Sequence, residues 1–273
     1  DHRDLHSFPT RRSSDLRVDN CSYSRYDSLA SEKDLSTLFE LLSSFRDNNG
    51  NPAVITANTV MTNPDFDKIR SSGFKTYFYE PFTETLKRYS NHANSFQLWK
   101  QGMHAGVFKP QFHGREHLNV NRWLIALQKN LGKNRLSFEY NMYDLSENDK
   151  ISENSFMDAL NIDKPDEIKF QLHSINEGSK LFEQLFGYCS KTFIAPCNIW
   201  SRKLNKTLKV NGIDCFQGNR FQLEPIPGKL NRFKKIFHYT GQKNDLGQIF
   251  LVRNSEFEPC QNPKTDIIGS CLS

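Results

Sequence analysis

Apolar positions change between two spacings along the chain, and this pattern predicts alternating helices and strands. After Ser31, leucine and phenylalanine recur at helical spacing, and Ser31 with Asp34 resembles the start of a capping box. Short apolar, β-branched runs typical of buried strands separate such segments. Predicted helices cover 31–47, 63–73, 94–105, 118–131, 165–186 and 201–210. Predicted strands cover 53–58, 75–80, 107–112, 136–142, 192–196 and 213–216, and hairpin signals flank 249–252.

This alternation predicts an α/β fold with a parallel sheet and right-handed crossovers. Either a barrel or a doubly wound sheet satisfies the pattern, and we favour the barrel-like arrangement. A polar, acidic loop is expected at 144–154. Because no repeat or linker is visible, residues 17–273 are expected to form a single domain.

The first sixteen residues are set apart from this pattern. Residues 1–16 read DHRDLHSFPTRRSSDL and have no periodicity, and the stretch resembles the in-frame translation of a sequencing adapter. We therefore expect an artefactual segment, exclude its histidines and aspartates from any site, and expect the natural N-terminus to be missing. The C-terminal end at Ser273 lacks a closing element, so truncation is expected there too.

Composition narrows the class of protein. The chain has 36 Lys+Arg against 31 Asp+Glu, a net charge of +5, without a long basic block. We therefore expect no nucleic-acid partner, and we expect the basic cluster Lys229–Lys235 to be a solvated face. No apolar run reaches about 18 residues, which predicts no membrane span. Six cysteines without a CxxC pair are typical of reduced thiols and favour a cytoplasmic location.

One dense polar cluster carries candidate chemistry. His113 directly follows a predicted strand, and His117 comes four residues later, near the start of the next helix. Catalytic loops of α/β barrels gather at the carboxyl ends of the strands. Two neutral imidazoles there, with a carboxylate from another strand, are suitable ligands for Zn²⁺ or another divalent ion. The alternative is that one histidine caps a helix and the other packs.

These residues also carry a resemblance to a known family. The run 110–117 (PQFHGREH) resembles the H-[ST]-x-x-H metal-binding motif of polysaccharide deacetylases of the NodB-homology type. Further segments resemble an uncharacterised bacterial branch of that superfamily: 25–31, 63–66, 79–83 and 193–200. The resemblance implies an incomplete, distorted (β/α) barrel. It also implies that His113 and His117 are two of three metal ligands.

The remaining parts of the family's site are not found in this chain. The resemblance implies a strand-end Asp pair, one a ligand and one the general base, upstream of Arg17. Asp19 and Asp27 are the nearest carboxylates, but neither follows an apolar strand. The family's Leu-x-His general acid is also unseen, and the expected Arg before Pro196 is absent. We therefore expect this chain to be inactive by itself, with the catalytic residues unknown.

Three further residues are candidates for substrate binding. Arg115 and Glu116 would orient the missing Asp or the glycan, or else form a local ion pair. Trp200 would line a sugar site, or else be a core residue on the first helical turn. His238 is expected to be structural, His173 to be a solvent or core residue in mid-helix, and Cys197 a buried thiol.

The resemblance implies a metal-dependent hydrolase that removes acetyl groups from a polysaccharide or glycan precursor. The alternative is a non-catalytic glycan-binding or surface-polysaccharide assembly protein on the same barrel. A third possibility is a glycoside hydrolase, which needs two facing carboxylates; no convincing pair is found, since Glu80 and Glu116 are merely candidates at strand ends. The sugar, the acyl linkage and the oligomeric state are not predicted.

Overall fold

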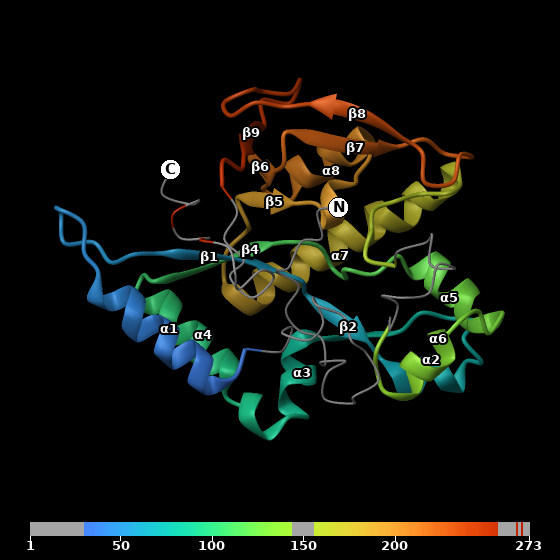
Figure 1. Cartoon of the computed structure of the whole chain (residues 1–273), viewed down its shortest axis with the longest axis horizontal. Coiled ribbons are helices and arrows are strands. Elements are labelled where there is room, and N and C mark those ends of the chain that lie inside the picture. The colour runs from blue at the N-terminus through green and yellow to red at the C-terminus, as the bar shows by residue number, and fades with distance from the viewer. Residues whose placement is uncertain (1–29, 144–155, 256–265, 267–268, 270–273) are drawn as a thin grey trace.

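Five parallel strands form the central sheet of the protein. A computed structural model describes residues 30–143 and 156–255, with 266 and 269, so segment 1–16 and the predicted loop 144–154 lie outside the described residues. The strands follow one another in chain order: β1 (Ile55–Thr59), β4 (Phe108–Phe112), β5 (Thr192–Ile194), β6 (Cys215–Gly218) and β9 (Ile249–Val252). In Figure 1 they rise from β1 in the middle of the view to β9 near the top.

The strand order excludes the doubly wound sheet among the described residues, but it does not show a closed barrel. A doubly wound sheet reverses its strand order at a switch point. Here the order rises from β1 to β9 without a reversal, as in a sheet wound in one direction. However, β1 and β9 stand at opposite ends of the order and do not pair with each other. Among the described residues the sheet is therefore open, and the predicted barrel is not closed there.

Two antiparallel ribbons lie outside this sheet. One pairs β2 (Thr62–Pro64) with β3 (Tyr79–Pro81), and the other pairs β7 (Phe221–Pro225) with β8 (Phe233–Phe237). The predicted strand 75–80 thus belongs to a ribbon and not to the parallel sheet. The predicted strand at 249–252 is β9, which pairs in parallel with β6. An antiparallel bridge also joins Lys243 to Ile249, so the predicted hairpin turn is present as well.

Eight α-helices are described. They are α1 (Glu32–Ser44), α2 (Phe66–Ser71), α3 (Phe82–Lys87), α4 (Ser95–His104), α5 (Val120–Gln128), α6 (Asn134–Glu139), α7 (Ile168–Phe186) and α8 (Asn205–Val210). Short 3-10 turns occur at Ser90–His92, Pro165–Glu167, Pro196–Asn198 and Arg202–Leu204. The capping box of α1 is confirmed, because the Ser31 hydroxyl accepts from the Asp34 amide and the Asp34 carboxylate accepts from the Ser31 amide. None of the described helices is long and apolar enough to cross a membrane.

Two predictions of secondary structure are wrong: the strand at 136–142 and the start of a helix at Pro64. The segment 136–142, predicted as a strand, is mostly helix α6, which buries Phe138 against Phe66 and leaves Leu136 exposed. Pro64, predicted to open a helix, ends β2, and the neighbouring Asp65 caps α2 by accepting from the Lys68 amide. At 136–142 the packing of Phe138 overrides the local strand pattern. At Pro64 the cap supplied by Asp65 sets the start of the helix later than the sequence predicted.

A row of phenylalanines forms the centre of the core. Phe112, Phe193, Phe216 and Phe250 pair in register across β4, β5, β6 and β9, and all four are buried. Helices α1, α4 and α7 pack on this face of the sheet: Phe108 contacts Trp99 of α4 and Phe39 of α1, and Phe112 contacts Phe182 of α7. This one-sided cover matches a sheet wound in one direction. Polar side chains on the opposite face, including Lys109, Gln111 and Gln217, line a cavity of about 430 Å³.

Candidate functional site

His113 directly follows β4, at the carboxyl end of the sheet, as the sequence predicted. Its backbone amide donates to the Thr59 carbonyl of β1 over 2.9 Å, and its side-chain Nδ1 lies 2.8 Å from the Ile194 carbonyl of β5. A carbonyl oxygen can only accept, so Nδ1 carries the proton and Nε2 of the neutral ring presents its lone pair. A contact of this kind is the usual device that fixes the tautomer of a metal-binding histidine.

His117 lies beside His113. The ring centroids are 5.0 Å apart and the ring planes are inclined by 59°. His117 stands two residues before Asn119, whose side chain caps α5 by accepting from the Arg122 amide. Both imidazoles are buried, with His113 fully enclosed and His117 5% exposed. The structure therefore brings together the two residues predicted as metal ligands.

The loop that joins the two histidines is held by the chain that follows β1. The Arg115 carbonyl accepts from both the amide and the hydroxyl of Thr62, at 2.7 and 2.9 Å, and the Gly114 carbonyl accepts from the Met61 amide. Gly114 has a φ of 123°, which L side chains rarely adopt. The glycine permits the sharp turn that returns His117 towards His113.

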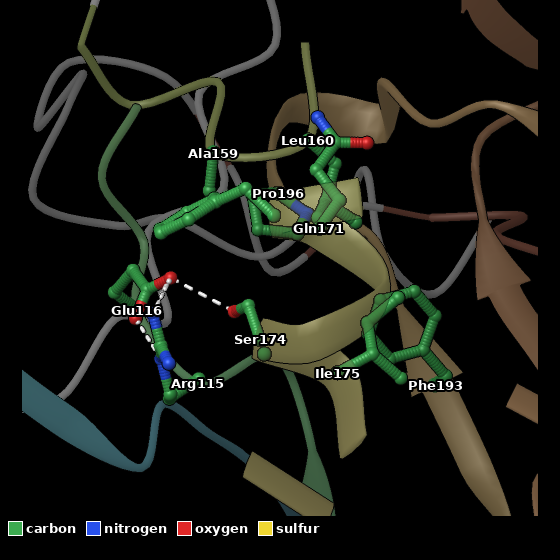
Figure 2. A pocket seen from close by; sticks show the side chains of 11 residues that line it. Arg115, Glu116, Ala159, Leu160, Gln171, Ser174, Ile175, Phe193 and Pro196 are labelled. Carbon is green, nitrogen blue, oxygen red and sulfur yellow. Dashed lines mark hydrogen bonds and ion pairs between the residues drawn. The ribbon is translucent and has the colours of Figure 1, made fainter. Parts of the chain in front are cut away.

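Arg115 and Glu116 form a buried ion pair. Nε and Nη2 of Arg115 donate to the two Glu116 oxygens at 2.5 and 3.1 Å, and Nη1 donates to Glu177 of α7 at 2.8 Å. The Ser174 hydroxyl, also from α7, donates to Glu116 over 2.8 Å (Figure 2). Burial by itself lowers the pKa of Arg115, but the charge and hydrogen bonds of Glu116 outweigh it and raise the pKa overall. This is the arrangement expected of the alternative, a local ion pair.

A narrow cavity separates this ion pair from its neighbours. Arg115 and Glu116 line one side, and the other walls include Leu160, Ser174 and Pro196 (Figure 2). It offers about 10 Å³ to a water-sized sphere, which is room for about one water molecule. Neither imidazole is among its lining residues, and a sugar ring does not fit it in this conformation.

Trp200 is part of the core. Its side chain is 3% exposed, stacks on Phe216 with the planes 14° apart, and donates its indole N–H to Asn205. These contacts match the alternative, a core tryptophan, and leave the ring face covered. Glu80, the other candidate carboxylate, accepts from Thr85 and pairs with Arg88. Glu80 and Glu116 are thus both tied to cations.

Three further residues were predicted to have no role in the site: His238, His173 and Cys197. His238 is buried, stacks on Phe250 and bonds to Gln222 and Gln242, in agreement with a structural role; burial lowers its pKa. His173 is exposed beside Glu177. Cys197 is only partly buried.

Sequence reasoning missed a buried network beside this site. Arg122 of α5 donates to both oxygens of Asp163 and, over 3.0 Å, to Asp158. Asn161 donates to Asp158 over 2.6 Å, and Asn119 bonds to two backbone carbonyls of the same loop. Burial raises the pKa of Asp158 to about 6, against the lowering effect of Arg122. The partners lie about forty positions apart in sequence, so no local motif announces them.

The metal ligand set is incomplete among the described residues. No group of three or more histidine, cysteine, aspartate or glutamate side chains is placed to hold a metal ion in the part of the chain that the structure describes. The two imidazoles and the tautomer of His113 fit a divalent ion, but a further ligand would have to come from outside these residues. The general base and acid are likewise not identified among them.

Comparisons with known proteins add little to this description. No protein-family model matches the chain, and no curated protein matches it. A solved structure, that of IcaB from Ammonifex degensii, is similar with a TM-score of 0.30 and 12% sequence identity. The match covers 53% of this chain and 47% of that one, so it spans about half the length of each. This TM-score is too low to assign a fold or an activity.

Proposed function

We propose that the complete protein is a metal-dependent hydrolase that removes acetyl groups from a polysaccharide or glycan precursor. In this proposal, His113 and His117 hold a divalent ion, with Zn²⁺ the preferred candidate. One observation carries this proposal: the imidazole rings of His113 and His117 lie side by side at the carboxyl end of β4, and Nδ1 of His113 is held by the Ile194 carbonyl. The motif resemblance of residues 110–117 supplies the substrate class.

The position of the two histidines in the fold supports this proposal. In α/β sheets with parallel strands, ligands and catalytic groups gather at the carboxyl ends of the strands. β4 is flanked by β1 and β5 on its two sides, and both neighbours contact His113 through backbone carbonyls. The ring is therefore fixed before any ligand binds, which lowers the ordering cost of binding.

The remaining residues of the motif support the ligands. When bound, a divalent ion supplies polarisation of an acyl carbonyl and activation of water for hydrolysis. Arg115 and Glu116, through Ser174 and Glu177, hold the His113–His117 loop against α7. We assign them a positioning role and not direct contact with the glycan.

The test is acetate release by the protein in which residues 1–16, which we expect to be artefactual, are replaced by the coding sequence found upstream of Arg17 in the genome. Acetylated polysaccharides with N- and O-linked acetyl groups are incubated with the protein and Zn²⁺, and both acetate and new reducing ends are measured. We expect acetate release that EDTA stops and that His113→Ala abolishes, without new reducing ends.

The matched control is His104→Ala, which removes an exposed imidazole from the end of α4. It should release acetate at the wild-type rate. Glycan binding without acetate release would favour the non-catalytic assembly protein, and new reducing ends would favour a glycoside hydrolase. Either result would overturn the proposal.

A further inference from the structure

The β7–β8 ribbon concentrates the positive charge of the chain. Residues 219–243 contain six basic side chains against Glu224 alone, which matches the net charge of +5 of the whole chain. Glu224 is held by Arg202 and so does not neutralise the ribbon. The six basic side chains are all exposed and take part in no described ion pair: Arg220, Lys229, Arg232, Lys234, Lys235 and Lys243.

Exposed aromatic rings lie on the outer face of the same ribbon. The register pairs Phe221 with Phe237 and Leu223 with Lys235, so these side chains share one face. Phe221 is 46% exposed and Phe237 53% exposed, and their rings meet edge to face at 5.8 Å. Tyr239, two residues after Phe237, is exposed as well. An exposed aromatic patch next to free cations is a feature of binding surfaces and not of an ordinary solvated face.

The inner face of the ribbon is anchored to the core. Gln222 is buried, donates to the Trp200 carbonyl and bonds to His238. Leu223 accepts from the Trp200 amide, which fixes the ribbon on the segment that follows β5. The outer face is therefore presented by a fixed backbone, at the top of the view in Figure 1.

The ribbon also lies on the side of the sheet that carries the candidate site. β7 begins shortly after the carboxyl end of β6, the same end at which His113 follows β4. At the turn of the ribbon, the Gly228 amide donates to the Asp163 carbonyl over 2.8 Å. The loop that contains Asp163 also supplies Leu160 to the cavity beside Arg115 and Glu116. A long polymer on the ribbon can thus extend towards the two histidines.

We propose that the outer face of the β7–β8 ribbon binds an anionic glycan chain, with Lys235 facing its acidic groups and Phe221 and Phe237 packing against its sugar rings. The flat apolar faces of pyranose rings suit exposed aromatic rings, and carboxylate or sulfate groups suit exposed lysines. The choice of a glycan over another polyanion rests on the proposed function, since the ribbon adjoins that site.

The test is affinity electrophoresis of the chain in gels that contain polygalacturonate, with EDTA present so that metal plays no part. Mobility is compared with that in polymer-free gels, which cancels the direct effect of charge. We expect retardation by polygalacturonate but not by dextran, a neutral glycan. Lys235→Glu should weaken the apparent affinity about fivefold.

The matched control is Lys75→Glu, which changes the net charge equally at an exposed position away from the ribbon. It should retain the wild-type affinity within about twofold. Phe237→Ser should weaken binding by about threefold, and this loss should persist at about 0.5 M salt, where the contribution of the lysines is screened.

Three results would overturn the inference: equal losses in the ribbon and control variants, equal retardation by dextran, or tighter binding of single-stranded DNA than of polygalacturonate. His113→Ala should leave the retardation unchanged. If the ribbon variants bind polygalacturonate as the wild type does, acetate release is unaffected. If the protein releases no acetate, the retardation by polygalacturonate is unaffected. The two proposals are therefore separately testable.

Discussion

His113 shows how a distant backbone atom determines the chemistry of a side chain. The sequence predicts its position after a strand, but the Ile194 carbonyl that receives its Nδ1 proton lies 81 positions away. Only the pairing of β4 with β5 brings the two together. The tautomer, and with it the nitrogen available to a metal, is therefore a property of the sheet and not of the local motif.

Arg115 and Glu116 show that charged residues next to a candidate site can serve in packing. Adjacent opposite charges in a cluster of histidines indicate a site, but the structure buries both and satisfies them with Ser174 and Glu177. Removal of one partner from such a pair leaves a buried charge, which costs about 3 kcal/mol or more. Their roles in packing and in positioning the site cannot be separated by sequence alone.

Asp158 provides a prediction about pH. Its pKa is raised from 3.8 to about 6 in the folded protein. Between about pH 4 and 6 the folded protein binds a proton at Asp158 that the unfolded chain does not bind. The contribution of this group to the free energy of unfolding therefore increases as the pH falls through this window, and is lost as the pH rises through about 6.

Asp158→Asn should remove that contribution while an amide oxygen still accepts from Arg122 and Asn161. Urea denaturation at pH 7 and pH 4 measures it as a difference between the two proteins. Relative to the variant, the wild type should gain about 2 to 3 kcal/mol on going to pH 4. Asp166→Asn, at an exposed carboxylate, is the control. Parallel pH profiles for wild type and Asp158→Asn would contradict the burial of a titrating Asp158.

Among the helices and strands, the long amphipathic helices and the short buried strands could be predicted from the sequence. Elements that are decided by packing between distant residues could not. The helix at 165–186 follows from the spacing of its apolar residues, and in the structure Gly187 in the left-handed conformation ends it. The segment 136–142 resembles a strand locally, but burial of Phe138 against Phe66 and Trp123 selects helix α6. Such contacts depend on residues far apart in sequence.

The approach of α7 to β4 depends on one glycine. A Cβ added at Gly178 would lie 2.9 Å from the Phe112 ring and from Cβ of Arg115. Alanine normally stabilises a helix interior by about 1 kcal/mol relative to glycine. Overpacking of a filled core costs about 1–3 kcal/mol. We therefore expect Gly178→Ala to lower the free energy of unfolding by about 1 kcal/mol overall.

Urea denaturation checks this expectation, with Gln184→Ala on the exposed side of α7 as the matched control. The control should change stability by less than about 0.5 kcal/mol. A Gly178→Ala protein more stable than wild type would show that α7 does not pack so closely on Phe112 and Arg115.

For the whole molecule, the parallel α/β class follows from the alternation of elements, and the one-directional winding follows from the order β1, β4, β5, β6, β9. The closure of a barrel could not be predicted, because periodicity carries no information about which strands end a sheet. The juxtaposition of His113 and His117 was predictable because both lie in one short loop. The Arg122–Asp158 network was not, because its members come from separate segments.

The central claim is that His113 and His117 bind one divalent ion together, and zinc binding tests it most directly. The complete protein, His113→Ala, His117→Ala and the control His104→Ala are each dialysed against Zn²⁺ and assayed for bound metal. We predict one zinc per chain in the wild type and in His104→Ala. His113→Ala and His117→Ala should lose stoichiometric binding, with affinity at least about 100-fold weaker. One tightly held zinc per chain in His113→Ala, or none in the wild type, would contradict the account.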